Sequence, residues 1–348
     1  MTICASCCKQ SAKLRCSRCK SAFYCDVSCQ SKHWEAHKIS CRAPSSNEFS
    51  GSSSSSRISS ISTALEQGSL SLKEVPRVSE VQKNAPKVQD FPSQLRDFSY
   101  SSSGDGVDEN LLILLHGLGD VHKNFFQLGQ KMDLPQTAVM AISGPIMFPE
   151  EIIHGRAWFV AFDEDWELIQ PEKGDERRLK SMRTATILLD KVIEVMCKSY
   201  GWTRDRVHVL GFSQGGTLAL DLALRSCGPR RLGSVVAISA SLLPEFLMQE
   251  LKEEDKDVAC GGACTSVLIT HGSQDNVVSK KEVRATRDFI SKIHPSVQVG
   301  LQFFNKEHCM VKSKEEMEHL MRFWSQHLHR RMVNMEKDST LYEVSHRQ

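Results

Sequence analysis

The chain has 348 residues, of which 40% are hydrophobic and 25% charged, enough for one large domain and a small one. The formal net charge of +2 gives no electrostatic case for nucleic acid or an anionic membrane as the main partner. No uninterrupted apolar run reaches about 18 residues, which excludes a membrane-spanning helix. The start of the sequence lacks the apolar core of a secretory signal. We therefore expect the cytoplasm, with the nucleus as the alternative, and cysteines that are thiols or metal ligands rather than disulfides.

The N-terminal segment is dense in cysteine: eight of the 13 cysteines fall within the first 41 residues. Their spacing gives C-x₂-C twice, then C-x₃-C, then H-x₃-C. The eight candidate ligands are Cys4, Cys7, Cys16, Cys19, Cys25, Cys29, His37 and Cys41. Sets of four thiolates, or of three with an imidazole, fit tetrahedral structural zinc, and so short a segment needs metal to fold. We predict two structural zinc ions, in preference to an iron–sulfur cluster or to scattered thiols, with Cys8 as a bystander.

The same segment resembles a MYND zinc finger, through "FYC", "CQ" and a late "HW..HK..C". The resemblance implies a protein-binding module of residues 1–43 with two interleaved zinc sites. One site would take Cys4, Cys7, Cys25 and Cys29, and the other Cys16, Cys19, His37 and Cys41. It also implies that Gln30 and Trp34 grip a proline-containing peptide. Lysine and arginine are scattered without a spaced aromatic platform, which agrees with a protein partner rather than a nucleic acid.

Residues 44–96 have the composition of a linker. From Pro44 to Ser93 there are 15 serines and four prolines, including the run Ser52–Ser56. Such a stretch cannot bury enough apolar surface to offset its ordering entropy, so we predict disorder. We also predict a polar tail with little structure for residues 332–348.

Between residues 97 and 331, short apolar runs alternate with segments of helical periodicity. The runs are Leu111–Leu115, Ala138–Ile142, Arg206–Leu210, Ser234–Ser239, Ser266–Thr270 and Val297–Phe304. The helical segments are Glu176–Tyr200, Thr217–Arg225, Val283–Ile293 and Glu315–His329. Strands that alternate with helices predict an α/β domain with a mostly parallel sheet flanked by helices.

Gly211-Phe212-Ser213-Gln214-Gly215 fits G-x-S-x-G, with a predicted strand before it and a helix after it. This context is the one that a nucleophile elbow requires, because flanking glycines let a serine hydroxyl project from a strained turn. The alternative, that Ser213 is an ordinary polar turn residue, is the less favoured interpretation.

A nucleophilic serine needs an imidazole to take its proton and a carboxylate to fix that imidazole. Asp275 follows the predicted strand Ser266–Thr270, and His308 follows the last predicted strand. His294 precedes a strand, at the wrong end of the sheet, and three other late histidines fall on a predicted helix, namely His319, His327 and His329. The pattern therefore predicts Ser213, Asp275 and His308 as a catalytic set.

Two backbone N–H groups would stabilise the negative charge that develops on the substrate. The residue after the nucleophile, Gln214, supplies one, and the glycine-containing loop His116–Asp120 after the first buried strand can supply another. Read as structure alone, His116-Gly117 is only a turn that ends a strand.

The motifs "LHGLGD", "GFSQGG" and "HGSQDNVV", with the late His308, together resemble the acyl-protein thioesterase, or phospholipase/carboxylesterase, family of α/β-hydrolases. The resemblance implies a Ser213–His308–Asp275 triad and oxyanion N–H groups from Leu118 and Gln214. It implies hydrolysis of thioesters or carboxylic esters with apolar acyl chains and no cofactor for catalysis. The chain departs from the family pattern at Ser279, at Asn305–Glu307 and in the acidic segment 163–176.

We therefore expect a serine hydrolase of the acyl-protein thioesterase kind, with a zinc finger for protein docking. A general carboxylesterase and a lysophospholipase are the alternatives within the enzyme class. An interaction scaffold with an inactive hydrolase domain is the alternative from another class.

Overall fold

The structure, a computed structural model, describes residues 4, 6–7, 14–16, 22–37, 70–74, 82–149, 155–171, 175–248, 263–332 and 342–346. The chain divides into two units: Met1–Val75 with Thr340–Gln348, and Pro76–Ser339. The second, larger unit contains every strand and helix of the predicted α/β domain. Cys8, Cys19, Cys41 and the run Ser52–Ser56 lie outside the described residues.

The larger unit is built on a seven-stranded sheet, whose strands are parallel except for one at the edge. Strand β4 pairs antiparallel with β6, and the others continue in parallel register, for example with Leu111 opposite both Ala138 and Val207. In spatial order the strands are β12 (Val299–Phe304), β11 (Ser266–Gly272), β10 (Ser234–Ile238), β9 (Val207–Phe212), β5 (Asn110–Leu115), β6 (Thr137–Ile142) and β4 (Phe98–Ser101).

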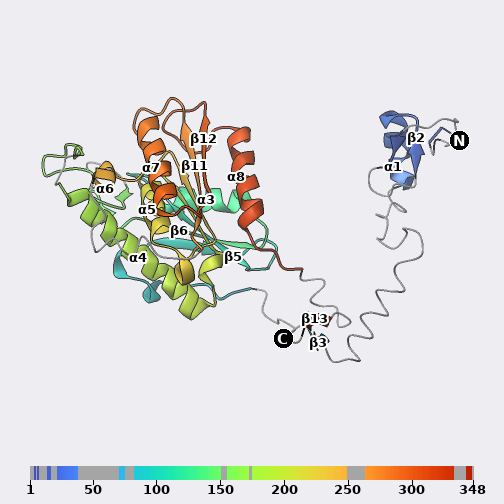
Figure 1. Ribbon diagram of the computed structural model, residues 1–348, viewed down its shortest axis with the longest axis horizontal. Coiled ribbons are helices and arrows are strands. Elements are labelled where there is room, and N and C mark those ends of the chain that lie inside the picture. The colour runs from blue at the N-terminus through green and yellow to red at the C-terminus, as the bar shows by residue number, and fades with distance from the viewer. Residues whose placement is uncertain are drawn as a thin grey trace. The chain divides into compact units, whose positions relative to one another are not determined.

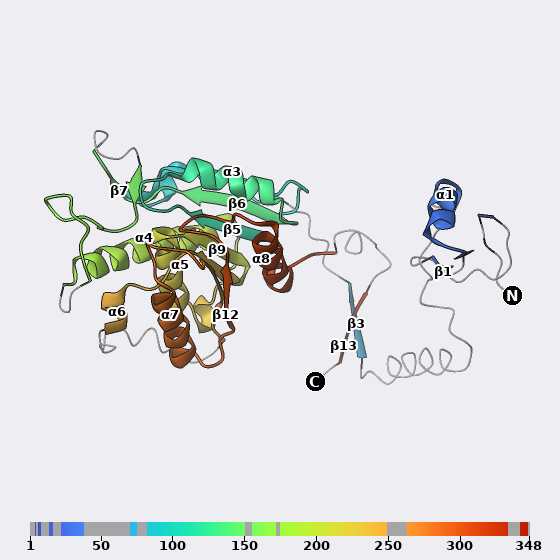
Figure 2. The ribbon, with the colours of Figure 1, turned by 90° about the horizontal axis from the view of Figure 1, so that it is seen from above.

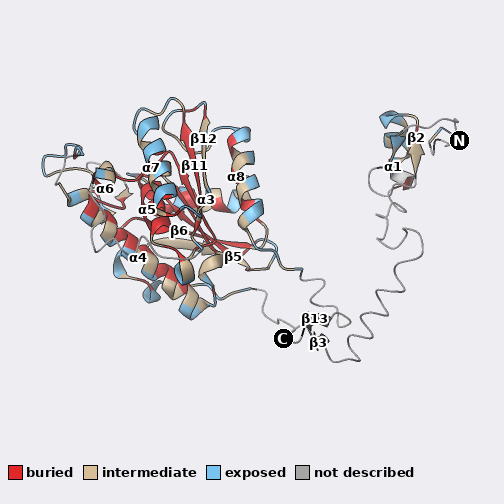
Figure 3. Ribbon diagram, viewed as in Figure 1, coloured by how far each residue is buried: buried red, intermediate tan, exposed pale blue. Residues whose placement is uncertain are grey.

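Helices cover both faces of this sheet (Figures 1 and 2). One face carries α4 (Arg177–Tyr200), α5 (Gln214–Leu224), α6 (Pro244–Met248) and α7 (Lys280–Ile293), and the other carries α3 (His122–Met132) and α8 (Lys314–His327). Successive side chains of a strand point to opposite faces, so the central strands are buried on both sides (Figure 3). In β5, Leu111, Ile113 and Leu115 pack toward α4 and α5, whereas Leu112 and Leu114 pack toward α3 and α8.

Short elements complete the larger unit. A two-stranded ribbon joins β7 (Ile146–Met147) to β8 (Arg156–Ala157) in antiparallel register. The described connections also contain four 3₁₀ turns: Val88–Asp90, Ser93–Leu95, Arg204–Arg206 and Gly228–Arg230. Within the ranges that the structure describes, no helix is both long and apolar enough to cross a membrane.

The segment 82–96 differs from the disordered linker predicted for residues 44–96. Its 3₁₀ turns place Phe91 and Leu95 in the main core, where they are 2% and 0% exposed. The ring of Phe91 meets that of Phe98 edge-on, with 5.1 Å between centroids. The burial of these two side chains is joined by hydrogen bonds of 2.8 Å from Lys83 N to Asp108 Oδ2 and from Lys87 N to Tyr200 Oη, which tie the segment to the larger unit. The ordered hydrolase unit therefore begins earlier than its composition indicates.

The smaller unit contains a finger and a separate strand pair. In the finger, β1 (Leu14–Arg15) pairs antiparallel with β2 (Phe23–Tyr24), and α1 (Val27–His37) follows. The strand pair joins β3 (Leu70–Glu74) to β13 (Tyr342–His346), with Leu72 opposite Val344. Residues 342–346 are therefore a strand, where the sequence predicted a polar tail without structure, because an antiparallel partner satisfies their backbone groups.

Phe91→Ala should lower the free energy of unfolding of the larger unit by about 3–5 kcal/mol, because it removes a buried ring and leaves a cavity. Val88→Ala is the matched control in the same segment, because Val88 is 50% exposed. We expect the control to change stability by about 0.5 kcal/mol or less. Urea unfolding of both variants measures the difference. Equal effects would mean that Phe91 does not stabilise the larger unit and that residues 82–96 act only as a linker.

Candidate functional site

Ser213 lies in a tight turn between β9 and α5, with φ of 50° and ψ of −117°. Two neighbouring glycines make the turn feasible. A Cβ on Gly211 would lie 2.2 Å from the carbonyl oxygen of Gly215, and one on Gly215 would lie 2.5 Å from the carbonyl oxygen of His116. Only glycine lets α5 approach the two strands this closely. The resulting turn holds Ser213 in a strained conformation at the N-terminus of α5.

Three side chains from separate loops form a continuous hydrogen-bonded chain. Ser213 Oγ lies 2.8 Å from His308 Nε2, and Asp275 Oδ2 lies 2.8 Å from His308 Nδ1. Since a carboxylate only accepts, Nδ1 carries the hydrogen and Nε2 of a neutral ring can accept from the serine hydroxyl. The structure therefore brings together the three residues that the sequence predicted, in the order that a general-base mechanism uses.

Asp275 is buried yet held in its charged form. Its side chain is 0% exposed, while that of His308 is 15% exposed. Its Oδ1 accepts hydrogen bonds from the backbone N–H groups of Val277 and Val278, both at 2.9 Å. Burial alone would raise the pKa of Asp275, but the hydrogen bonds from Val278, His308 and Val277 keep this pKa below its ordinary value. The carboxylate is thus ready to orient an imidazole.

A further histidine, His271, lies beside this carboxylate, with its Nδ1 3.8 Å from Asp275 Oδ2. Its Nε2 donates to the carbonyl oxygen of Val278 at 3.1 Å. Burial lowers the pKa of His271, which favours the neutral ring. The ring packs edge-on against Phe303. The sequence analysis did not single out His271 as a neighbour of Asp275, because the histidine lies within the strand, before Gly272.

The loop that carries His308 is fixed by a buried ion pair. Lys306 Nζ lies 2.7 Å from Glu316 Oε1, and the two side chains are 1% and 0% exposed. The same ammonium group donates to the carbonyl oxygens of Cys309 at 2.9 Å and Met310 at 3.4 Å. Thr270 Oγ1 donates to Glu316 at 2.9 Å. Three acceptors thus satisfy the three N–H bonds of the Lys306 ammonium group. The lysine precedes His308 and the two carbonyl oxygens follow it, so these contacts link the backbone before and after the histidine.

Backbone contacts join this loop to the loop of Asp275. Gln274 N donates to the carbonyl oxygen of Lys306 at 3.0 Å, and Ser273 N donates to that of Phe304 at 2.7 Å. A Cβ on Gly272 would lie 2.4 Å from the carbonyl oxygen of Lys306, so only glycine permits this contact. The relative placement of Asp275 and His308 is therefore set by the main chain.

The His116–Asp120 loop is held next to Ser213, with the predicted donor Leu118 36% exposed within it. The side chain of His116 spans the loop: Nδ1 donates to the carbonyl oxygen of Gly117 at 2.6 Å, and Nε2 accepts from Gly144 N at 2.8 Å. Burial lowers the pKa of His116. Within the described residues, the backbone N–H groups of Leu118 and Gln214 have no acceptor, which leaves both able to bind an oxyanion.

The side chain of Gln214 has a second, structural role that the sequence did not reveal. Its Oε1 accepts from Trp158 N at 2.7 Å and its Nε2 donates to the carbonyl oxygen of Phe159 at 2.8 Å. Trp158 is fully buried, and its indole N–H donates to the carbonyl oxygen of His116 at 2.9 Å. Gln214 and Trp158 therefore fix the His116–Asp120 loop against the N-terminus of α5.

Residues 163–171 of the acidic segment begin with a turn that exposes apolar surface. Asp163 Oδ1 accepts from the backbone N–H groups of Asp165 and Glu167, at 3.0 and 2.9 Å. Trp166 is 43% exposed, and its ring centroid lies 6.2 Å from those of Phe148 and Phe162.

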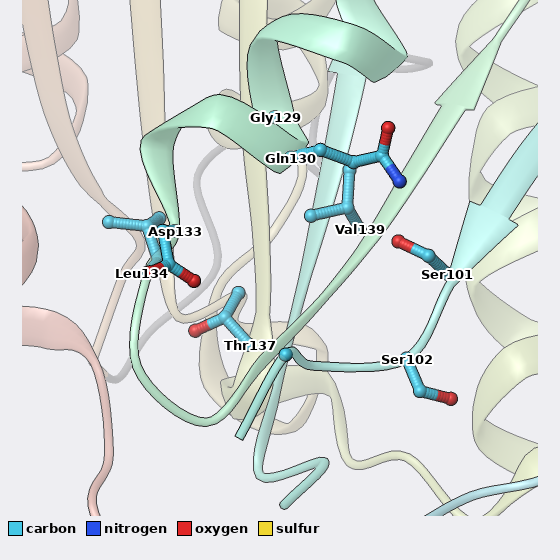
Figure 4. A pocket seen from close by; sticks show the side chains of 9 residues that line it. Ser101, Ser102, Gly129, Gln130, Asp133, Leu134, Thr137 and Val139 are labelled. Carbon is cyan, nitrogen blue, oxygen red and sulfur yellow. The ribbon is translucent and has the colours of Figure 1, made fainter. Parts of the chain in front are cut away.

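A cavity of about 240 Å³ opens among the end of β4, the end of α3 and the start of β6 (Figure 4). Ser101, Gln130, Asp133 and Thr137 are among its lining residues. Thr137 begins β6, whereas Ser213 follows the end of the parallel strand β9. The cavity therefore lies at the N-terminal ends of the parallel strands and Ser213 at their C-terminal ends. None of the predicted site residues lines this cavity.

In the finger, Cys4, Cys7, Cys25 and Cys29 offer sulfur atoms that all lie within 4.8 Å of one another. Cys7 Sγ and Cys25 Sγ are 3.5 Å apart. Asp26 supports the cluster by accepting from Cys29 N at 2.8 Å. Four sulfurs at this spacing fit one tetrahedral zinc ion.

The second predicted zinc site is described only in part. Cys16 and His37 are buried at 1% and 7% exposure, and both lie near Tyr24, which also contacts His33 through its hydroxyl at 3.2 Å. The other two predicted ligands, Cys19 and Cys41, lie outside the described residues. Gln30 and Trp34 both lie on α1, where Gln30 is half-buried and Trp34 is 36% exposed.

Comparisons with known proteins match the two parts of the chain separately. Residues 101–328, more than half of the chain, match the family described as phospholipase/carboxylesterase. Residues 4–41 match the MYND finger. An uncharacterised hydrolase of Mycosarcoma maydis is 35% identical over 150 residues, which are 42% of this chain and 54% of that protein. The chain thus spans about half the length of this curated relative.

Two further likenesses concern the fold and the finger. The crystal structure of acyl-protein thioesterase 2 from Zea mays aligns with a TM-score of 0.51 and 20% identity, over 67% of this chain and 99% of that one. This likeness shows an α/β-hydrolase fold. An N-lysine methyltransferase of Danio rerio is 45% identical over 42 residues, which are 12% of this chain and 10% of that protein.

Lys306→Met should lower the free energy of unfolding by about 3–5 kcal/mol, because the buried carboxylate of Glu316 loses its cation. The matched control is Lys314→Met, which removes a lysine from an ion pair that is 92% and 59% exposed. Such surface pairs contribute about 0–1 kcal/mol. Denaturant unfolding measures both, and similar costs would mean that the Lys306–Glu316 pair does not hold the loop of His308.

Proposed function

The chain belongs to the phospholipase/carboxylesterase family, and we propose that it is a serine hydrolase that cleaves acyl thioesters or carboxylic esters. One observation carries the proposal: His308 bridges Ser213 and Asp275 with two contacts of 2.8 Å. The strained turn of Ser213 and the two N–H groups of Leu118 and Gln214 support it. The chemistry needs no metal or organic cofactor.

The proposed reaction proceeds through an acyl-enzyme. Ser213 Oγ attacks the acyl carbon while its proton passes to His308 Nε2, and Asp275 stabilises the imidazolium through Nδ1. The carbonyl oxygen becomes negative and accepts hydrogen bonds from the N–H groups of Leu118 and Gln214. His308 then gives the proton to the departing thiol or alcohol. Water, activated by the same imidazole, releases the acid and restores Ser213.

The substrate class rests on the family and on apolar surface near the serine. Leu118 is 36% exposed in the loop beside Ser213, which favours an acyl chain as the group recognised. Acyl thioesters are the first proposal, and lysophospholipids and short carboxylic esters are the alternatives. Relative kcat/KM values on a panel of the three classes distinguish them.

The finger is proposed to hold two zinc ions and to dock a protein partner. The cluster of Cys4, Cys7, Cys25 and Cys29 supports the first ion. The second would take Cys16, Cys19, His37 and Cys41. An exposed Trp34 on α1 supports capture of a proline-containing peptide, with Gln30 one turn away on the same helix.

Ser213→Ala, His308→Ala and Asp275→Asn should each lower ester hydrolysis, with losses for serine and histidine on the order of 10⁴-fold or more. The serine and histidine losses should not add, because the two residues act in one step. A fluorophosphonate probe should label the wild type and not Ser213→Ala. The matched control, Ser226→Ala, removes a buried serine beyond the other end of α5 and should keep the label. Near-full turnover by a folded His308→Ala protein would remove that residue from the mechanism, and an unlabelled wild type would favour the inactive scaffold.

Chelation should remove zinc from the finger and unfold it, while hydrolysis of a small soluble ester continues, because the proposed triad uses no metal. Cys25→Ser and Cys16→Ser should each lower the zinc content by about one ion per chain, since each deletes a thiolate from a different tetrahedral site. Elemental analysis and an esterase assay on the same samples measure both effects. Hydrolysis that stops with chelation would contradict this separation of roles.

Two controls separate the ligands from their neighbours. Cys8→Ser should leave the zinc content unchanged, because Cys8 is surplus to the two predicted sets. Trp34→Ala should also keep its zinc yet lose partner capture, because the indole lies outside both sets. Zinc loss in Trp34→Ala would make that residue structural instead.

A further inference from the structure

A second group of metal-ligating side chains lies in the hydrolase unit, away from Ser213. Cys227 follows α5, Cys264 precedes β11, and His294 directly follows α7. One ligand atom from each lies within 4.8 Å of the other two. The 11 residues of α5, about 16 Å of helix, separate this end from Ser213. The group, here called the Cys227 cluster, plays no part in the proposed hydrolysis.

The main chain holds the two cysteines side by side. Cys227 and Cys264 are partners in an antiparallel bridge, next to a hydrogen bond of 2.8 Å from Gly228 N to the carbonyl oxygen of Ala263. Thr265 Oγ1 adds a bond of 2.7 Å to the carbonyl oxygen of Ser226. Opposed residues of such a bridge carry their side chains on the same face. The sulfurs are therefore brought together by backbone geometry rather than by chance rotamers.

The hydrogen bonds of His294 identify which of its nitrogens can bind a metal. The side chain is buried, and Nε2 lies 3.0 Å from the carbonyl oxygen of Leu224. A carbonyl only accepts, so Nε2 carries the hydrogen and the neutral ring has its lone pair on Nδ1. Nδ1 lies 3.5 Å from Cys264 Sγ. Metal-binding histidines usually donate their other N–H to a carbonyl or a carboxylate in this manner.

The spacing suits zinc. A zinc ion with bonds of about 2.3 Å to sulfur and about 2.0–2.1 Å to nitrogen, at a tetrahedral angle, separates those ligand atoms by roughly 3.5 Å. His294 Nδ1 lies 3.5 Å from Cys264 Sγ, whereas Cys227 Sγ lies 4.0 Å from Nε2, so Cys227 Sγ has to move toward Nδ1 once the disulfide is reduced. Thiolate and imidazole donors together select zinc over the hard cations calcium and magnesium. Three protein ligands leave one tetrahedral position for a fourth donor.

The oxidation state of Cys227 decides whether its sulfur can serve. Cys227 is disulfide-bonded, and among the described cysteines it alone is. This differs from the expectation from sequence that every cysteine is a thiol or a metal ligand. A sulfur in a disulfide has no thiolate to offer, so the disulfide and a metal ion compete for the same atom.

We propose that reduction of the Cys227 disulfide creates a zinc site formed by Cys227, Cys264 and His294. A dithiol reductant supplies two electrons and two protons, which cleave the S–S bond into two thiols, and the reductant becomes a disulfide. Zinc then displaces the thiol protons of Cys227 and Cys264 and binds the lone pair of His294 Nδ1. The ion ties the end of α5 to the start of β11 and the end of α7.

The test compares the zinc content of full-length variants kept in a phosphine reductant, loaded with zinc and desalted. Cys264→Ser and His294→Gln should each hold about one zinc ion fewer per chain than the wild type, because each loses one ligand of a single site. Cys197→Ser is the matched control: its half-buried thiol lies on α4, outside the cluster, and zinc content should not change. Comparison by difference removes the contribution of the finger. After oxidation, the difference between the wild type and the variants should vanish.

A second measurement uses the wild type alone, so its result does not depend on whether a variant folds. In reduced wild type, added zinc should slow alkylation of Cys264 by about tenfold or more, because alkylation requires an unbound thiolate. Cys197 in the same sample should react at an unchanged rate, as read by peptide mass spectrometry. Equal zinc in reduced wild type and the folded variants, or no protection of Cys264, would overturn the proposal. Either result leaves the proposed hydrolysis at Ser213 untouched, since labelling by fluorophosphonate reports on that separately.

Discussion

The close approach of α5 to β9 and β5 is the constraint on which the rest of the site depends. At Gly211 and Gly215 the neighbouring carbonyl oxygens would lie 2.2 and 2.5 Å from any Cβ, so the helix can pack at this depth only without side chains there. Packing at this depth forces the connecting residue, Ser213, to a φ of 50° and leaves the first N–H groups of α5 beside its hydroxyl. The parallel order of β9, β11 and β12 then brings the loops of Asp275 and His308 to the same edge of the sheet.

Two departures from the family pattern, at Ser279 and at Asn305–Glu307, place polar side chains that stabilise their loops. Ser279 caps the N-terminus of α7: its side chain accepts from Glu282 N, and the carboxylate of Glu282 accepts from Ser279 N. Lys306 is buried against Glu316 and braces the backbone on the far side of His308. A proline or a glycine would shape these loops by restricting or freeing the backbone, whereas this chain shapes them with polar contacts. The price is that Lys306 and Glu316 each depend on the other to remain buried.

The sequence predicted those elements whose signal lies within a few neighbouring residues. Each buried strand was visible as an apolar run, and Ser213 was visible through its glycines, because these signals need no knowledge of distant residues. The sequence missed β4, in which two of the four residues are serine, and α3, in which Gly129 rather than an apolar side chain packs against the core. It missed the packing of Phe91, because two apolar side chains vanish in the average composition of a serine-rich stretch. It also missed the Lys306–Glu316 pair and the meeting of Cys227 with His294, 67 residues apart, since both contacts arise only once the sheet has assembled.

The hydrogen-bonded ring of His116 affects how the stability of the larger unit responds to acid. An unfolded histidine takes up a proton below about pH 6.5, but folded His116 cannot do so without losing the hydrogen bond from Gly144 N. Because the pKa of His116 is lowered in the folded protein, unfolding takes up a proton as the pH falls below about 6.5. The stability that the neutral ring provides is complete above about pH 6.5 and declines as the pH falls below that value. Mild acid thus destabilises the His116–Asp120 loop by favouring its unfolded form.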